Sequence, residues 1–370
     1  MSEIPGELVD SVIDLVSESR PTLTACSLVC RQWVHRSRYH SFSSIKLVRS
    51  QSVKLDTVTT FLQILESPLV TIVPSVREVY LSHKTNRIPV LSIGDIICLL
   101  ARHGLTPTFL SISGRCNRLG RAGPFPSTTR IHLCLTDAVL TQMVDFIHDF
   151  GSLECLSLDL RERPVDHTVT TAKQRRKLRL PPSLCELRVV KPQALRSMLA
   201  LRYLPILTRL LVHGTSESGW KDVGAYLSDP RVSSTLEHLT VEDGFTGEHS
   251  LPSLPTLRHL SIRKPIPYIA YHASTVVASL HRAAGARKLQ TVELLDSMAY
   301  SYGSADERKW PELDSMLADR IAFPCLRTVI VGAEDLDAGI KLVCALMPLC
   351  DAQGILSVQY RSAVHDPFRP

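Results

Sequence analysis

The sequence predicts an α/β fold that grows by repetition, with a parallel sheet inside, helices outside and a separate helical segment at the N-terminus. Three observations predict it. A short apolar motif recurs through most of the 370 residues, helical patterns separate its copies, and polar residues alternate with the apolar ones inside each copy. A core that lengthens with each repeat also suits a chain longer than the roughly 250 to 300 residues at which single cores stop growing.

Composition narrows the class of protein. A net charge of +6 with 44% hydrophobic and 21% charged residues excludes a disordered chain. The ten cysteines contain no CxxC pair, which favours reduced thiols over a disulfide framework or a zinc site. The acidic residues Glu7 and Asp10 have the wrong charge for the start of a signal peptide. No apolar run has the length of a membrane span. We therefore expect a soluble protein of the cytoplasm, the nucleus or both, without membrane contact or cofactor.

The N-terminal segment, residues 1–44, is predicted to form three short helices. Pro5 suits the first turn of a helix, because the amide that it lacks would have no partner there. Apolar residues then recur at helical spacing, and further helices are expected over residues 22–28 and 29–39, where Trp33 is the large apolar side chain. So small a unit hides little apolar surface by itself. Two interpretations follow: a cap on the next domain, or a surface for a partner helix.

Two motifs in this segment resemble an F-box. The first is IPGEL, residues 4–8, and the second is ACSLVCRQW, residues 25–33. The resemblance implies docking onto the Skp-type adaptor of a cullin-RING ubiquitin ligase, with residues 1–44 as the F-box. The residues that it assigns to adaptor binding are Pro5, Leu8, Ile13, Leu28, Val29 and Trp33.

From residue 45 onward, the recurring motif places apolar residues at its first, fourth and sixth positions. Copies from Val76 to Leu326 start at intervals that average about 28 residues, a period typical of leucine-rich-repeat solenoids. The clear copies begin at Leu153, Leu184, Leu207, Leu236, Leu257, Leu289 and Leu326. Weaker or partial copies include Val76, Leu110, Thr128 and Leu356.

Helical patterns lie between the copies. Val58, Phe61, Leu62 and Leu65 have the i, i+3, i+4, i+7 spacing of an amphipathic helix, and residues 93–100 and 340–347 repeat it. Ser and Thr side chains can cap such helices, and the predicted N-caps are Ser92 and Thr136.

The alternation inside each strand separates a solenoid from a doubly wound α/β domain. Strands covered on both faces read as continuous apolar runs, whereas Arg188, His238 and Thr240 here interleave with leucine and valine. One face of the sheet is therefore expected to be polar, and residues 45–370 are predicted to form the solenoid.

One feature of regular leucine-rich repeats is missing. An asparagine or cysteine normally follows the last apolar position by three residues and ties successive turns together. The residues found there are Arg161, Pro192, Thr215, Gly244, Pro265, Ser297 and Glu334. We expect an irregular, degenerate solenoid with uneven loops, similar to the repeat region of divergent fungal F-box proteins.

No motif predicts an enzyme. GxSxG, HExxH and a GxGxxG after a strand are all absent. His238 and His259 occupy equivalent positions in neighbouring repeats and are expected side by side as a surface pair without a metal. The basic run from Lys173 to Arg179 favours a solvated loop, with a nuclear-import signal as the alternative. A charge of +6 without an aromatic platform argues against nucleic-acid binding.

The expected function is that of a substrate receptor in a Skp-cullin-F-box ubiquitin ligase, with no catalysis of its own. Its partners would be the adaptor, through it the cullin, and a protein client whose identity the sequence does not give. One alternative is a repeat scaffold that does not engage the ligase, and the other is an enzyme of unrecognised type. Client contact is expected at outward strand positions, namely Tyr80, His132, Arg188, His213, Glu242 and Arg263.

Overall fold

The structure, a computed structural model, is an α/β fold in which the strands of the described residues pair in parallel. The chain divides into two compact units, Met1–Ser183 and Leu184–Pro370. The described residues are 5–50, 56–67, 70–83, 92–115, 119, 125–136, 140–160, 179–199, 201, 203–213, 217–242, 251–263, 280, 286–295, 310–333 and 336–360.

The first unit begins with three short helices. These are α1 (Gly6–Leu15), α2 (Arg20–Cys26) and α3 (Arg31–Ser41). Pro5 directly precedes α1, and its carbonyl accepts the amides of Leu8 and Val9 at 3.1 and 3.3 Å. Pro21 lies in the first turn of α2, where its missing amide costs no helical hydrogen bond.

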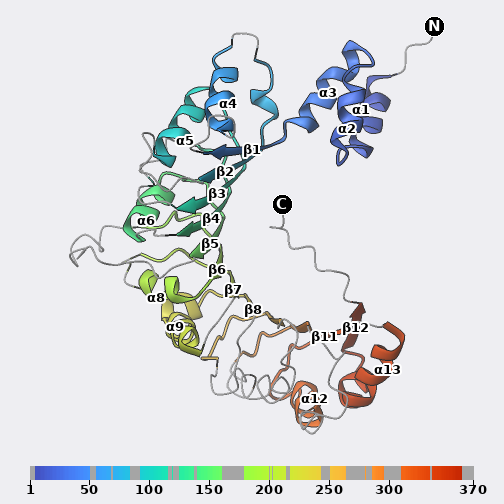
Figure 1. The fold of residues 1–370 in the computed structure, drawn as a ribbon. Coiled ribbons are helices and arrows are strands. Elements are labelled where there is room, and N and C mark those ends of the chain that lie inside the picture. Colours follow the sequence, from blue (N-terminus) through green and yellow to red (C-terminus); the bar gives the residue numbers. More distant parts are fainter. Residues whose placement is uncertain are drawn as a thin grey trace. The chain divides into compact units, whose positions relative to one another are not determined.

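A parallel sheet and its helices form the rest of the first unit. Its strands, each paired with the next in chain order, are β1 (Ser44–Arg49), β2 (Glu78–His83), β3 (Phe109–Arg115), β4 (Arg130–Thr136) and β5 (Cys155–Leu160). Its helices are α4 (Thr57–Leu65), the 3₁₀ turn η2 (Val73–Ser75), α5 (Ile93–Arg102) and α6 (Leu140–His148). Helices α4, α5 and α6 all lie on one side of these strands (Figure 1).

The second unit continues the same alternation. Its strands, again in chain order, are β6 (Glu186–Val190), β7 (Arg209–His213), β8 (His238–Glu242), β9 (His259–Arg263), β10 (Thr291–Leu295), β11 (Thr328–Ala333) and β12 (Leu356–Tyr360). Its helices are α8 (Gln193–Leu199), α9 (Glu217–Leu227), α10 (Pro230–Ser233), α12 (Trp310–Ala318), α13 (Leu336–Leu346) and α14 (Pro348–Ala352).

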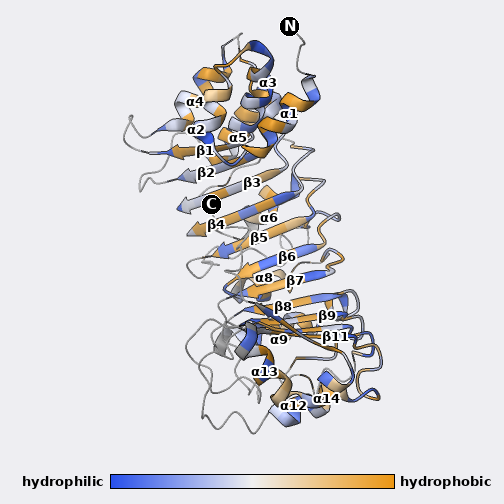
Figure 2. Ribbon diagram, turned by 90° about the vertical axis from the view of Figure 1, so that its right-hand side faces the viewer, coloured by the Kyte–Doolittle hydropathy of each residue, from blue (hydrophilic) through white to orange (hydrophobic). Residues whose placement is uncertain are grey.

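The predicted copies of the apolar motif coincide with strands. In the copy at β5, Leu153, Leu156 and Leu158 are all fully buried, and the equivalent residues of the other clear copies are buried too. The hydropathy colours alternate along the strands (Figure 2), as expected when one face packs on helices. The motif search missed β1, whose buried Ile45 and Leu47 begin the sheet.

Side-chain hydroxyls join successive strands at the end of the sheet where the strands begin. Just before a strand, a Thr or Ser hydroxyl donates to a backbone carbonyl just before the preceding strand, and we call this series the hydroxyl ladder. Its donors and acceptors are Thr128 and Pro107 (2.7 Å), Ser183 and Leu153 (2.7 Å), Thr235 and Leu207 (3.0 Å), and Thr256 and Leu236 (2.9 Å). Each bond satisfies a carbonyl at a turn, as buried backbone groups require.

The two N-cap predictions have different outcomes. Ser92 caps α5: its hydroxyl accepts the Asp95 amide at 3.1 Å, and the Asp95 carboxylate accepts the Ser92 amide at 2.8 Å, which completes a capping box. The prediction for Thr136 is wrong, because this residue is still the last residue of β4.

Three expectations from composition concern groups that the structure describes only in part. The nine described cysteines form no disulfide with one another. Within the described ranges, no helix combines the length and the apolar character needed to cross a bilayer. Of the basic run, only Arg179 is described, so this prediction lies almost entirely outside the described residues.

Candidate functional site

Helix α1 carries two apolar stripes, and only one of them is buried. Val9 and Ile13 are 2% and 0% exposed. Leu8, Val12 and Leu15 follow a second helical stripe on another side of the helix, and Leu15 is 85% exposed. Leu28 and Val29, in the turn between α2 and α3, are also exposed. We call these five exposed side chains the N-terminal apolar surface.

The buried stripe forms a small core for the three helices. Val9, Ile13 and Leu23 pack together, and Trp33 is partly buried against them. This places the six predicted adaptor residues in two groups. Pro5 and three residues of the apolar surface are accessible, whereas Ile13 is enclosed and can act only by holding the helices. Trp33 has a mixed position, since part of its ring belongs to the core.

An ion-pair cluster fixes α1 against α3. Both oxygens of the Asp14 carboxylate accept from the Arg36 guanidinium at 2.7 Å, and His40 Nε2 lies 2.7 Å from Asp14 Oδ1. The hydrogen bonds from Arg36, and then His40, lower the pKa of Asp14 to about 2. The ion pair adds to the packing of Trp33 against the small core, and it fixes the orientation of α1 relative to α3 because a bidentate pair restricts both distance and angle.

The second candidate surface is the face of the sheet that the helices leave uncovered. We call it the open face; it consists of the strand positions that alternate with the buried ones. All six predicted client residues lie there and are partly exposed. The two-residue period of a strand places them on the side away from the core. Their role as client contacts stays a prediction.

In the first unit, the open face combines aromatic rings and cations. The Tyr80 ring packs edge-on against Phe109 with centroids 5.4 Å apart, and the Lys46 ammonium lies 5.7 Å from the Tyr80 centroid. Arg130 lies 5.8 Å from the Phe109 centroid. His132 shares a 2.9 Å hydrogen bond with Ser157 on the next strand. Burial, followed by the neighbouring Glu78 carboxylate, raises the pKa of Tyr80 to about 12, so its hydroxyl remains a hydrogen-bond donor.

In the second unit, charges on adjacent strands pair with one another across the open face. Glu242 on β8 lies 3.0 Å from His213 Nδ1 on β7 and 3.3 Å from Arg263 Nη1 on β9. The hydrogen bond from His213 is the main cause that lowers the pKa of Glu242, and Arg263 acts in the same direction. Three residues predicted separately as client contacts therefore form one connected group.

The predicted histidine pair is present. His238 and His259 stand opposite each other in the parallel register, with ring centroids 5.5 Å apart. The sequence suggested no carboxylate beside them, but Glu293 on β10 reaches His259 Nε2 at 3.5 Å from a diagonal position. Burial, and then the charge of His259, lowers the pKa of His238. Among the described residues, no group of three or more His, Cys, Asp or Glu side chains could hold a metal ion.

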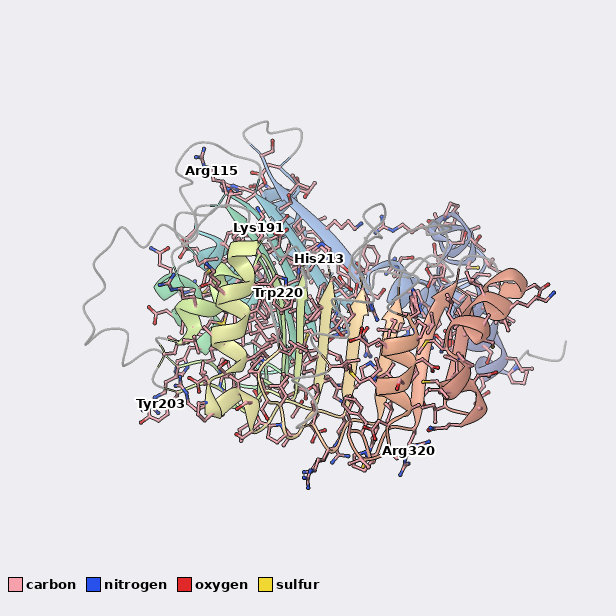
Figure 3. All side chains as sticks on the ribbon, turned by 90° about the horizontal axis from the view of Figure 1, so that it is seen from below. Arg115, Lys191, Tyr203, His213, Trp220 and Arg320 are labelled. Atoms are coloured by element: carbon pink, nitrogen blue, oxygen red, sulfur yellow. The ribbon has the colours of Figure 1, made fainter. Side chains whose placement is uncertain are left out.

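In the second unit, different residues lie at the two ends of the strands. Figure 3 shows Lys191 and His213 at the carboxyl ends of β6 and β7, and Tyr203 and Arg320 at the opposite end, before β7 and β11. The Lys191 amide donates to the His213 carbonyl at 3.0 Å, and Lys191 has a φ of 72°, in the left-handed region. This strained turn keeps the carboxyl ends of β6 and β7 joined beside the Glu242 group.

Sequence reasoning missed part of the N-terminal apolar surface. Val12 and Leu15 were not selected, although both are exposed. A helix of ten residues with apolar side chains on two stripes has more apolar surface than one small core can cover, and that excess was the available signal.

Comparison with known proteins adds no assignment. No protein-family profile matches the chain, and no curated protein matches it in sequence.

Proposed function

We propose that the chain is the substrate-receptor subunit of a Skp-cullin-F-box ubiquitin ligase. Residues 1–44 would be the F-box, and residues 45–370 an irregular leucine-rich-repeat solenoid that binds a protein client. The observation that carries the proposal is the N-terminal apolar surface, three of whose five residues, Leu8, Leu28 and Val29, belong to the two motifs that resemble an F-box.

The energetic argument is that this surface is too apolar to remain in water. Burying a Val or Leu side chain contributes about 1.5 to 3 kcal/mol. Leu8, Leu15 and Leu28 are each more than half exposed, on a group of three helices whose apolar core consists of Val9, Ile13 and Leu23. Exposed apolar groups gathered on a small helical unit mark a protein interface. An adaptor that offers an apolar helix groove would cover them.

The client would bind the open face. Its polar side chains stand in parallel rows across neighbouring strands, as in other repeat proteins that use a sheet to bind partners. In this proposal the chain makes and breaks no bond itself. It holds the client near the loaded conjugating enzyme and so raises the effective concentration of client lysines.

Purified full-length chain and a purified Skp-type adaptor test the first half of the proposal. The double variant Leu8→Ala/Leu28→Ala removes only exposed side chains and should weaken binding by at least about tenfold. The matched control, Ile206→Ala/Ile321→Ala, removes two apolar side chains of the second unit that are also more than half exposed, and it should bind like the wild type. Titration calorimetry measures both.

Two outcomes would overturn adaptor binding. One is no complex with the wild type, which would favour a scaffold outside the ubiquitin ligase. The other is equal binding by the two double variants.

Proximity labelling in cells tests the second half. Client proteins labelled by the wild type should be lost with Arg188→Ala/Arg263→Ala, which removes two cations from the open face, and should persist with Leu8→Ala/Leu28→Ala. An unchanged set of labelled proteins in the first variant would show that the client binds elsewhere.

A further inference from the structure

A cavity of about 580 Å³ lies in the first unit, where the N-terminal helices meet the first strand and helix of the sheet. Side chains from α2, α3, β1 and α4 line it, together with the segment that precedes η2. Cavities of about 300 to 1,000 Å³ are the usual size for small-molecule ligands. Neither the F-box resemblance nor the open face assigns a role to this cavity.

The walls of the cavity are largely apolar. Ile64, on α4, is 47% exposed, although it borders buried residues such as Phe61 and Leu47. A ligand that covers a half-exposed isoleucine beside an apolar wall removes apolar surface from water, and this burial favours binding of the ligand. The apolar lining consists of Phe42, Ile45, Leu47, Phe61, Ile64, Val70 and Ile72.

Two cations line the same cavity and can face it, and Arg49 pairs with its one carboxylate, Asp56. Arg20 and Arg38 contribute positive charge, and no described carboxylate pairs with either of them. Arg38 donates only a long hydrogen bond, 3.4 Å, to the Thr71 hydroxyl. Asp56 also lines the cavity, but Arg49 lies 3.0 Å from its carboxylate. The cavity thus offers a net positive potential above apolar walls.

We propose that this cavity binds an amphipathic monocarboxylate, a compound with one carboxylate and an alkyl chain. The alkyl chain of the ligand would cover the apolar wall, and the carboxylate of the ligand would accept hydrogen bonds from Arg20 and Arg38. A neutral apolar compound would form no charge-assisted hydrogen bond with the two guanidinium groups, and an inorganic anion would leave the apolar wall in water. This inference does not depend on the proposed ligase function.

Binding would also connect two parts of the first unit. Arg20 and Arg38 belong to the N-terminal helices, whereas Ile64 and Phe61 belong to the first helix beside the sheet. A ligand that contacts both should slow amide exchange in residues 42–47, which join them.

Decanoate is the probe, and 1-decanol is its uncharged match. Titration calorimetry on the full-length chain should show saturable binding of decanoate and weaker binding of decanol. Arg20→Gln/Arg38→Gln should weaken decanoate binding by about tenfold or more, since hydrogen bonds to charged groups are lost. Arg102→Gln/Arg327→Gln, two exposed arginines outside the cavity, is the matched control and should bind decanoate like the wild type.

Nuclear magnetic resonance gives a second measurement that depends on no variant. Contacts between decanoate methylenes and the methyl groups of Ile64 or Ile72 are expected. The proposal is overturned if decanoate does not bind, if decanol binds as tightly, if both arginine pairs have equal effects, or if these methyl contacts are absent.

Discussion

Thr128 provides a sharp test of the hydroxyl ladder. Its side chain is 0% exposed, and its hydroxyl donates to the buried Pro107 carbonyl at 2.7 Å. Thr128→Val keeps the shape of the side chain but removes the donor. The other nearby hydroxyl, Ser127, lies 3.5 Å from the same carbonyl and is too distant to replace it. The carbonyl would be left unsatisfied, at a cost of about 1 to 3 kcal/mol in the free energy of unfolding.

The direction of the change in unfolding free energy separates the contribution of the hydrogen bond from that of apolar burial. Valine is more apolar than threonine, so without the hydrogen bond Thr128→Val should stabilise the protein. Thr128→Ser keeps the donor and loses one methyl group, about 0.8 kcal/mol. We expect the order of stability to be wild type, Ser, Val.

Tyr226 is the matched control, because its buried hydroxyl has no hydrogen-bond partner among the described residues. Burial raises the pKa of this group. Tyr226→Phe should leave stability unchanged or raise it by up to about 1 kcal/mol.

Urea unfolding gives the stabilities, and hydrogen-exchange mass spectrometry of β3 and β4 localises the change at Thr128. A Thr128→Val protein as stable as the wild type, with unchanged exchange in β4, would refute the role of the ladder.

The remaining predictions concern two carboxylates, Asp14 and Asp314, and one glycine, Gly114. Protonation of Asp14, whose pKa of about 2 lies below its ordinary 3.8, should loosen α1 from α3 as the pH falls from about 4 to 2; exchange of α1 amides should show this acid sensitivity in the wild type and lose it in Asp14→Asn. Asp314→Ala should cost about 3 to 5 kcal/mol in urea unfolding, because the buried carboxylate accepts two backbone amides at the start of α14 at 2.8 and 2.9 Å; a loss below 1 kcal/mol would contradict this. Gly114→Ala should lower thermal stability and increase exchange in β2 and β3, because the φ of 126° disfavours a side chain and a Cβ would clash with the His83 carbonyl; a melting temperature equal to the wild type would exclude that strain.

Part of the N-terminal surface followed from the sequence and part did not. The motifs selected Leu8, Leu28 and Val29, which are exposed, and also Ile13, which is enclosed. Periodicity identifies an apolar stripe but does not say which of two stripes on one helix meets the core, since that depends on how the neighbouring helices pack.

The sequence by itself determined the parallel sheet and the position of nearly every strand, because each copy of the apolar motif buries its own side chains at a strand. The alternation of polar and apolar residues also determined that residues such as Arg188 lie on the open face. It did not identify β1, although Phe42, Ile45 and Leu47 have the spacing of the motif, because this copy begins inside the segment assigned to the N-terminal helices. Only the tertiary structure decided which partners meet: Glu242 with His213 and Arg263, Asp14 with Arg36, and Thr128 with Pro107. These contacts join residues 21 to 29 positions apart, and strand register together with helix packing, which local periodicity does not encode, sets them.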